Sequence, residues 1–82
     1  METTLTAKTV KQQVSDIALD ISWAKIAQKY FGKSSSWIYH KLDGIDGNGN
    51  PSDFTYSEKL HLKNALFDFS ERIRHAAENI DV

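Results

Sequence analysis

The sequence contains no cysteine, one proline and four glycines among its 82 residues. The absence of cysteine excludes a disulfide framework and thiolate metal ligands. No apolar run is longer than three residues, so no segment predicts a membrane span. The first twenty residues also lack the apolar run of a secretory signal. We therefore expect a cytoplasmic protein that is held together by packing alone.

Acidic residues are absent from one stretch, Ser22–Leu42, which carries four lysines and a formal charge of +4. The remaining six basic residues and all eleven acids lie elsewhere, which gives the rest of the chain a charge of −5. The net charge of −1 is thus the sum of a basic segment and an acidic remainder. A cationic segment on an acidic body is typical of proteins that contact a nucleic-acid backbone.

Hydrophobic periodicity predicts helices and no strand, so the sequence indicates an all-α fold of four helices in a single domain, residues 1–82. After a flexible start at residues 1–6, apolar residues recur at i, i+4, i+7 and i+11. This spacing predicts a first helix over residues 7–20 with one apolar face.

Two shorter helices are expected inside the basic stretch, where they form a helix–turn–helix at residues 22–42. Ser22 can cap the first of them, at residues 23–31, because its hydroxyl can accept from an otherwise unpaired amide. Gly32 can end that helix, since glycine adopts the left-handed conformation without a Cβ clash. Ser34 or Ser35 can serve as the N-cap of the third helix. We expect that helix to end near Leu42, with Asp43–Gly44 as its stop.

The remainder of the chain predicts a loop and a long final helix. Residues 44–53 hold three of the four glycines and the only proline, which is the composition of a loop. Thr55 and Glu58 have the spacing of a capping box. We therefore expect the final helix over residues 55–80.

The basic stretch supplies the parts that a helix–turn–helix needs. Ala27 can be the small residue where the helices cross, Gly32 the turn, and Ile38 and Leu42 the apolar anchors. Residues 27–44 resemble the helix–turn–helix core of the repressor and Cro-like superfamily, which begins with an alanine, turns at a glycine and closes with a leucine and a glycine. The interval from Ala27 to Gly32 is one residue longer than is usual in that family.

Lys33 is a second departure, because the family prefers an apolar residue after the glycine. Residues 21–80 are also similar to small uncharacterised helix–turn–helix proteins of Bacteroidetes mobile elements and phages. These resemblances imply a transcriptional regulator that recognises double-stranded DNA by sequence.

The third helix would present polar side chains to DNA if Ile38 and Leu42 anchor it. Side chains that both donate and accept hydrogen bonds suit base edges, whereas lysines and a helix N-terminus suit phosphates. The expected base contacts are Ser35, Ser36, Tyr39 and His40, and the expected phosphate contacts are Lys33, Ser34 and Lys41, with Lys25 and Lys29 further out.

The final helix carries an apolar heptad seam that serves either as a dimer interface or as part of the core. The seam is too short to predict a free coiled coil, so packing on the first helix and pairing with a second copy both stay open. A homodimer would suit DNA binding through paired half-sites. The alternative function is a protein-interaction module that uses this helix. The seam residues are Leu62, Leu66, Phe69, Ile73, Ala76 and Ile80.

No residue pattern predicts an enzyme, a metal site, a cofactor or a small-molecule substrate. Asp46, Asn48 and Asn50 resemble the start of a calcium loop, but Pro51 and Ser57 occupy the positions of its glycine and its glutamate. The three histidines are scattered, and no glycine-rich phosphate loop is present.

Overall fold

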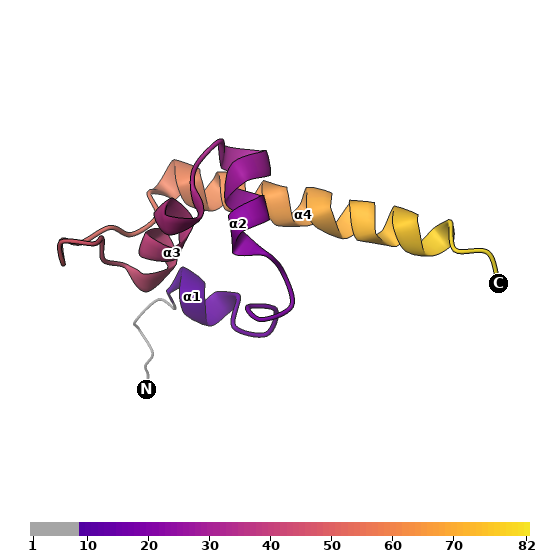
Figure 1. The fold of residues 1–82 in the computed structure, drawn as a ribbon, viewed down its shortest axis with the longest axis horizontal. Coiled ribbons are helices and arrows are strands. Elements are labelled where there is room, and N and C mark those ends of the chain that lie inside the picture. The colour runs from indigo at the N-terminus through magenta and orange to yellow at the C-terminus, as the bar shows by residue number, and fades with distance from the viewer. Residues whose placement is uncertain (1–8) are drawn as a thin grey trace, which may run out of the picture.

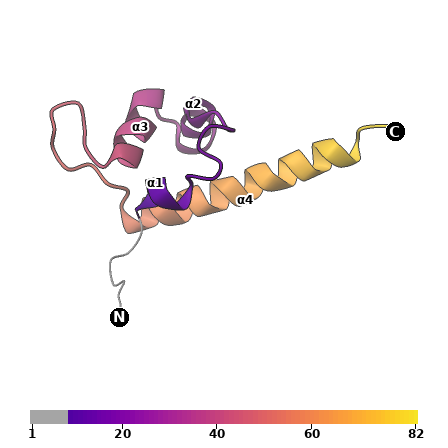
Figure 2. The same ribbon diagram turned by 90° about the horizontal axis from the view of Figure 1, so that it is seen from below.

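A computed structural model describes residues 9–82, and within this part of the chain the fold is all-α without a strand. Three short helical segments gather over the first half of a long C-terminal helix, whose second half projects from the group (Figures 1 and 2). The predicted fold class is confirmed. The elements are α1 (Val10–Gln13), α2 (Trp23–Ile26), the π-helical turn η1 (Ala27–Phe31) that continues α2, α3 (Ser35–Asp43) and α4 (Tyr56–Glu78).

The first helix is much shorter than the predicted span of residues 7–20. The beginning of that span, and the flexible start predicted at residues 1–6, lie outside the described residues. Thr9 caps α1 by accepting from the Gln12 amide at 3.1 Å. Regular helix ends at Gln13, and residues 14–20 form consecutive turns in which several amides bond three residues back.

Contacts with the core hold the turns that follow Gln13. The indole N–H of Trp23 donates to the Ala18 carbonyl at 3.0 Å, which ties the last of these turns to the core. Val14 is buried, and Ile17 and Ile21 pack against the core at its edge. The apolar residues thus keep a helical spacing in the sequence while the backbone between them turns.

The helix–turn–helix segment has the predicted caps and stops. The Ser22 hydroxyl accepts from the Lys25 amide at 3.3 Å, and the Ser34 hydroxyl accepts from the Trp37 amide at the same distance. Gly32 and Gly44 end the two helical segments with left-handed φ angles of 64° and 79°. Ala27 and Ile38 have no exposed surface and belong to one apolar cluster. A small residue at position 27 therefore lies in the packed core of this segment.

The long helix α4 begins at the predicted capping box. The Thr55 hydroxyl accepts from the Glu58 amide at 3.2 Å, and the Glu58 carboxylate accepts from the Thr55 amide at 2.8 Å. Residues 71–80 are all exposed. No helix within residues 9–82 combines the length and the apolar character needed to cross a membrane.

The heptad seam of α4 is divided between the core and the surface. Leu62 is buried, and Leu66 and Phe69 pack against the core. The helix α1 lies over the first half of α4 (Figure 2), and Ile26 and Tyr30 line a groove together with Phe69. The second half of the seam has no such cover and consists of Ile73, Ala76 and Ile80, all exposed.

Candidate nucleic-acid interface

The turn before α3 contains the additional residue noted in the sequence. Residues 27–31 form a π-helical turn, and the amide of Gly32 donates to the Ala27 carbonyl, five residues back. A π turn holds one more residue than an α turn at the same place. The longer interval is therefore absorbed inside the helix, and Gly32 still reverses the chain.

Tyr30 and Phe31, the last two residues of this π-helical turn, attach the helix–turn–helix to α4. The Tyr30 carbonyl accepts a hydrogen bond from His61 Nε2. The Tyr30 hydroxyl donates to Asp68 at 2.6 Å and accepts from Arg72 at 3.1 Å. Phe31 meets the His61 ring edge-on, with centroids 4.6 Å apart. The sequence did not predict that Tyr30 and Phe31 contact α4. The additional residue between Ala27 and Gly32 was the signal in the sequence that pointed to this segment.

The helix α3 buries one side and presents polar side chains on the other. Ile38 is fully buried, and Leu42 packs against the core at its edge. Helical geometry places Ser36 and His40 on the side opposite Ile38. Ser36 is exposed, and its hydroxyl lies 3.2 Å from that of Ser34. Ser36 and His40 form the centre of the polar face of α3.

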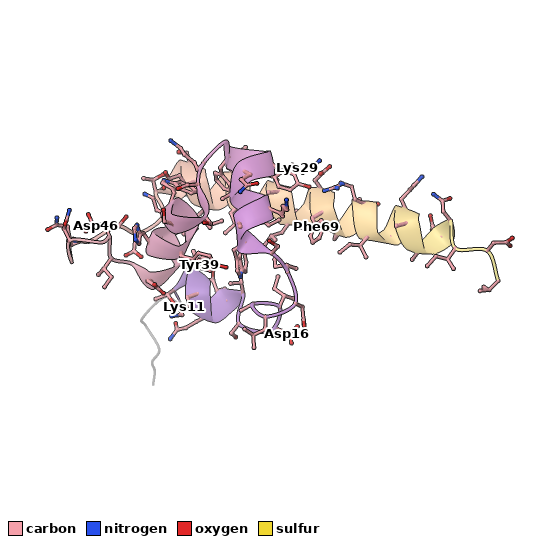
Figure 3. The ribbon with its side chains drawn as sticks, in the orientation of Figure 1. Lys11, Asp16, Lys29, Tyr39, Asp46 and Phe69 are labelled. Carbon is pink, nitrogen blue, oxygen red and sulfur yellow. The ribbon has the colours of Figure 1, made fainter. Side chains whose placement is uncertain are left out.

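The loop after α3 lies against one edge of this face. The His40 ring approaches Gly47 so closely that a Cβ added there would be 3.8 Å from the ring. The Asp46 carboxylate accepts from the amides of Asn50 and Asn48 at 3.0 and 2.8 Å, and these hydrogen bonds lower its pKa. Asp46 thus fixes the loop, which forms one end of the molecule (Figure 3).

Two of the predicted base contacts lie at the sides of α3 rather than at the centre of its free face. Tyr39 is 46% exposed and faces α1, where it lines a groove of about 430 Å³ with Leu19 and Trp23 (Figure 3). Ser35 is half-buried. Their positions follow from the helical rotation, which turns each of them partway back toward the core side.

The four lysines of the basic stretch do not form one surface. Lys25 and Lys29 lie on the α2–η1 segment and line a groove beside α4 (Figure 3). Lys33 and Lys41 lie instead near the Trp37 ring, with their ammonium groups 5.9 and 5.8 Å from its centroid. The charge division seen in the sequence therefore becomes two separate cationic groups.

Lys41, which the sequence predicts as a phosphate contact, is engaged inside the protein. Its ammonium lies 3.1 Å from the Glu58 carboxylate and donates to the Asp53 carbonyl at 3.2 Å, and its side chain is only 15% exposed. Partial burial raises the pKa of Glu58, but hydrogen bonds from the Thr55 amide and from Lys41 outweigh it and leave that pKa lowered. Lys41 therefore connects α3 to the start of α4.

The N-terminal turn of α3 remains as the cationic end of the polar face. Ser34 serves as the cap, with its hydroxyl oxygen accepting from the Trp37 amide. Lys33 is exposed just before it. The positive end of the α3 dipole and the Lys33 ammonium together favour an anion at this end.

The fold and this face define a small all-α protein with a helix–turn–helix segment and a projecting C-terminal helix. The chain belongs to the family described as a domain of unknown function (DUF5053), whose model matches residues 10–80. No curated protein and no solved structure matches the chain significantly. The family match includes every helix of the described residues.

Proposed function

We propose that this protein binds duplex DNA through α3 and acts as a sequence-specific transcriptional regulator of the phage or mobile-element type. The observation that supports this proposal is the division of α3 into two sides. Ile38 is fully buried on one side, while Ser36 and His40 lie on the other. Hydroxyl and imidazole groups can each donate and accept, as base-edge recognition in the major groove requires.

The phosphate contacts of the proposal are fewer than the sequence alone suggested. Lys33 and the N-terminal amides of α3 are the groups that would bind phosphates at the start of the polar face. Lys25 and Lys29 stay predicted as outer contacts. Each phosphate that a lysine neutralises releases counterions, so affinity for any duplex should fall as salt rises.

A DNA-binding titration tests the proposal directly. Fluorescence anisotropy with an arbitrary duplex should show affinity that falls steeply between about 50 and 200 mM salt. Selection from a random duplex library should then enrich a common sequence. His40→Ala and Ser36→Ala should weaken binding to the enriched sequence more than to arbitrary DNA, whereas Lys63→Ala, on α4 beside α1, should change neither.

An affinity that does not change with salt concentration, or a library selection that enriches no sequence, would contradict the proposal. The second candidate function is the binding of another protein, which the exposed second half of α4 favours. A pairing of two copies through that helix would combine both functions, because a dimer would present two α3 helices to DNA half-sites about 34 Å apart.

A further inference from the structure

The second half of α4 exposes an apolar stripe that continues the buried one. Ile73 and Ile80 are 53% and 67% exposed, and Ala76 lies between them on the same side of the helix. Leu62, Leu66 and Phe69 cover the core with the first half of this stripe. The apolar side of α4 that packs inside the protein therefore continues along the exposed second half of the helix.

A cationic groove lies where the stripe leaves the core. It has a volume of about 580 Å³ and is formed between the α2–η1 segment and α4. Ile26 and Phe69 contribute apolar surface, while Lys25, Lys29 and Arg72 contribute three positive charges. None of the described residues that line it is acidic. Such a groove fits a segment that is both apolar and acidic.

The residues that follow α4 have that chemistry. Residues 80–82 are Ile80, Asp81 and Val82, and α4 stops just before them at Glu78. The tail points away from the groove of its own molecule, at the far end of α4 (Figure 1). It can therefore reach such a groove only on another molecule.

We propose that a second copy of this chain packs antiparallel on the exposed stripe and inserts residues 80–82 into the groove. In one register of the two helices, apolar residues face apolar residues and opposite charges face each other. Ile73 faces the partner's Ile80, and Ala76 faces the partner's Ala77 near the twofold axis, where small residues allow close approach. Arg72 then faces the partner's Asp81.

The same register fits the ends of the helices. The partner's helix runs toward the domain and ends at Glu78, so it stops before reaching α2. Residues 80–82 of the partner then lie beside Phe69 and the lysines of the groove. Because the pairing is twofold, each contact occurs twice.

A parallel pairing fits the same stripe less well. It would place Arg72 opposite the partner's Arg72 and would leave both grooves empty. The exposed stripe is short, since residues 71–80 span about 15 Å at 1.5 Å per residue. Insertion into the two grooves adds buried surface to that of the stripe, and specific interfaces bury about 1,200 Å² or more.

Charge reversal tests this pairing without DNA, so the result is independent of whether α3 binds DNA. Sedimentation velocity of the full chain should show a concentration-dependent dimer. Arg72→Glu and Asp81→Arg should each weaken that dimer about tenfold or more, because each variant opposes like charges twice. Mixing the two variants should restore dimers, since both of the 72–81 contacts in a mixed dimer again join opposite charges.

Arg74→Glu is the matched control, because Arg74 lies on the same helix away from the stripe and pairs with Glu78 of its own chain at 3.5 Å. It should leave the dimer largely intact. Circular dichroism checks that Arg72→Glu still folds after losing its bond to Tyr30. If it does not fold, Ile80→Asp replaces it and should also give monomers, since Ile80 is exposed within its own chain.

A wild-type monomer at high micromolar concentration would overturn the proposal. A dimer that is insensitive to Asp81→Arg and Ile80→Asp would also overturn it. Variants that dimerise no better when mixed than when separate would reject the antiparallel register.

Discussion

The ammonium of Lys41 and the carboxylate of Glu58 lie 3.1 Å apart, and this ion pair connects the last turn of α3 to the capping box of α4. Glu58 also accepts from the Thr55 amide at 2.8 Å, so one carboxylate both caps α4 and holds α3. The contact fixes the orientation of α3 on the body of the protein. A lysine of the basic stretch thus stabilises the fold that presents the polar face.

Replacing Lys41 should therefore affect stability more than DNA binding. We expect Lys41→Ala to lower the free energy of unfolding by about 1–2 kcal/mol, since it removes a partly buried ion pair and a cation–π contact with Trp37. Urea unfolding measures this loss. Lys33→Ala is the control, because Lys33 is exposed and shares the cation–π contact with Trp37 but has no ion pair within the described residues, so we expect it to cost less than about 1 kcal/mol.

The Glu58 carboxyl should make stability depend on pH in the acid range. Its pKa is lowered in the folded protein, so its contribution is fully present above its unfolded pKa of about 4.3. The contribution is lost as the pH falls through the lower folded pKa. Urea unfolding from pH 7 to pH 3 should show that wild type and Glu58→Gln differ most at neutral pH and converge in acid. A constant difference would contradict this assignment.

Lys33 and Lys41 should differ in the salt dependence of DNA binding. If Lys33 contacts one phosphate, Lys33→Ala should reduce the magnitude of the log–log salt slope by about 0.9 per protomer. Lys41→Ala should leave the slope unchanged once the protein is folded, because its ammonium already pairs with Glu58. Anisotropy titrations at several salt concentrations make the comparison. Equal slopes for Lys33→Ala and wild type would remove Lys33 from the interface.

The π-helical turn should depend on its bonds to α4. Tyr30→Phe removes the hydroxyl that bonds Asp68 and Arg72, and we expect a loss of about 1 kcal/mol or somewhat more, since both partners are charged. His61→Ala leaves the Tyr30 carbonyl without this donor and removes the ring beside Phe31, so its cost should be larger. Urea unfolding measures both, and Ser57→Ala, at an exposed position of the first α4 turn, serves as the reference.

The sequence predicted the elements whose signals are local. Ser22, Ser34 and Thr55 cap their helices through hydroxyls that bond amides three residues away, and Gly32 and Gly44 end helices through their own φ angles. Each of these devices acts within one turn of the chain. Their residue types and spacings were therefore sufficient to predict them.

The tertiary structure decided the features that depend on distant residues. Regular helix ends at Gln13, and the turns that follow are held by the bond of the Trp23 indole to the Ala18 carbonyl and by apolar side chains that pack in the core. The Lys41 ammonium is withdrawn from solvent because Glu58, seventeen residues later, lies beside it. Neither event changes the local pattern that sequence analysis evaluates.

The heptad seam shows the same distinction in a single helix. The spacing of Leu62 to Ile80 determines that these side chains share one side of α4, because that follows from helical geometry alone. Where the cover of that side ends is set by the packing of α1 and α2, which reaches Phe69 and no further along the seam. The sequence by itself determined the stripe, and only the tertiary structure decided which half of it is core and which half is free to meet a partner.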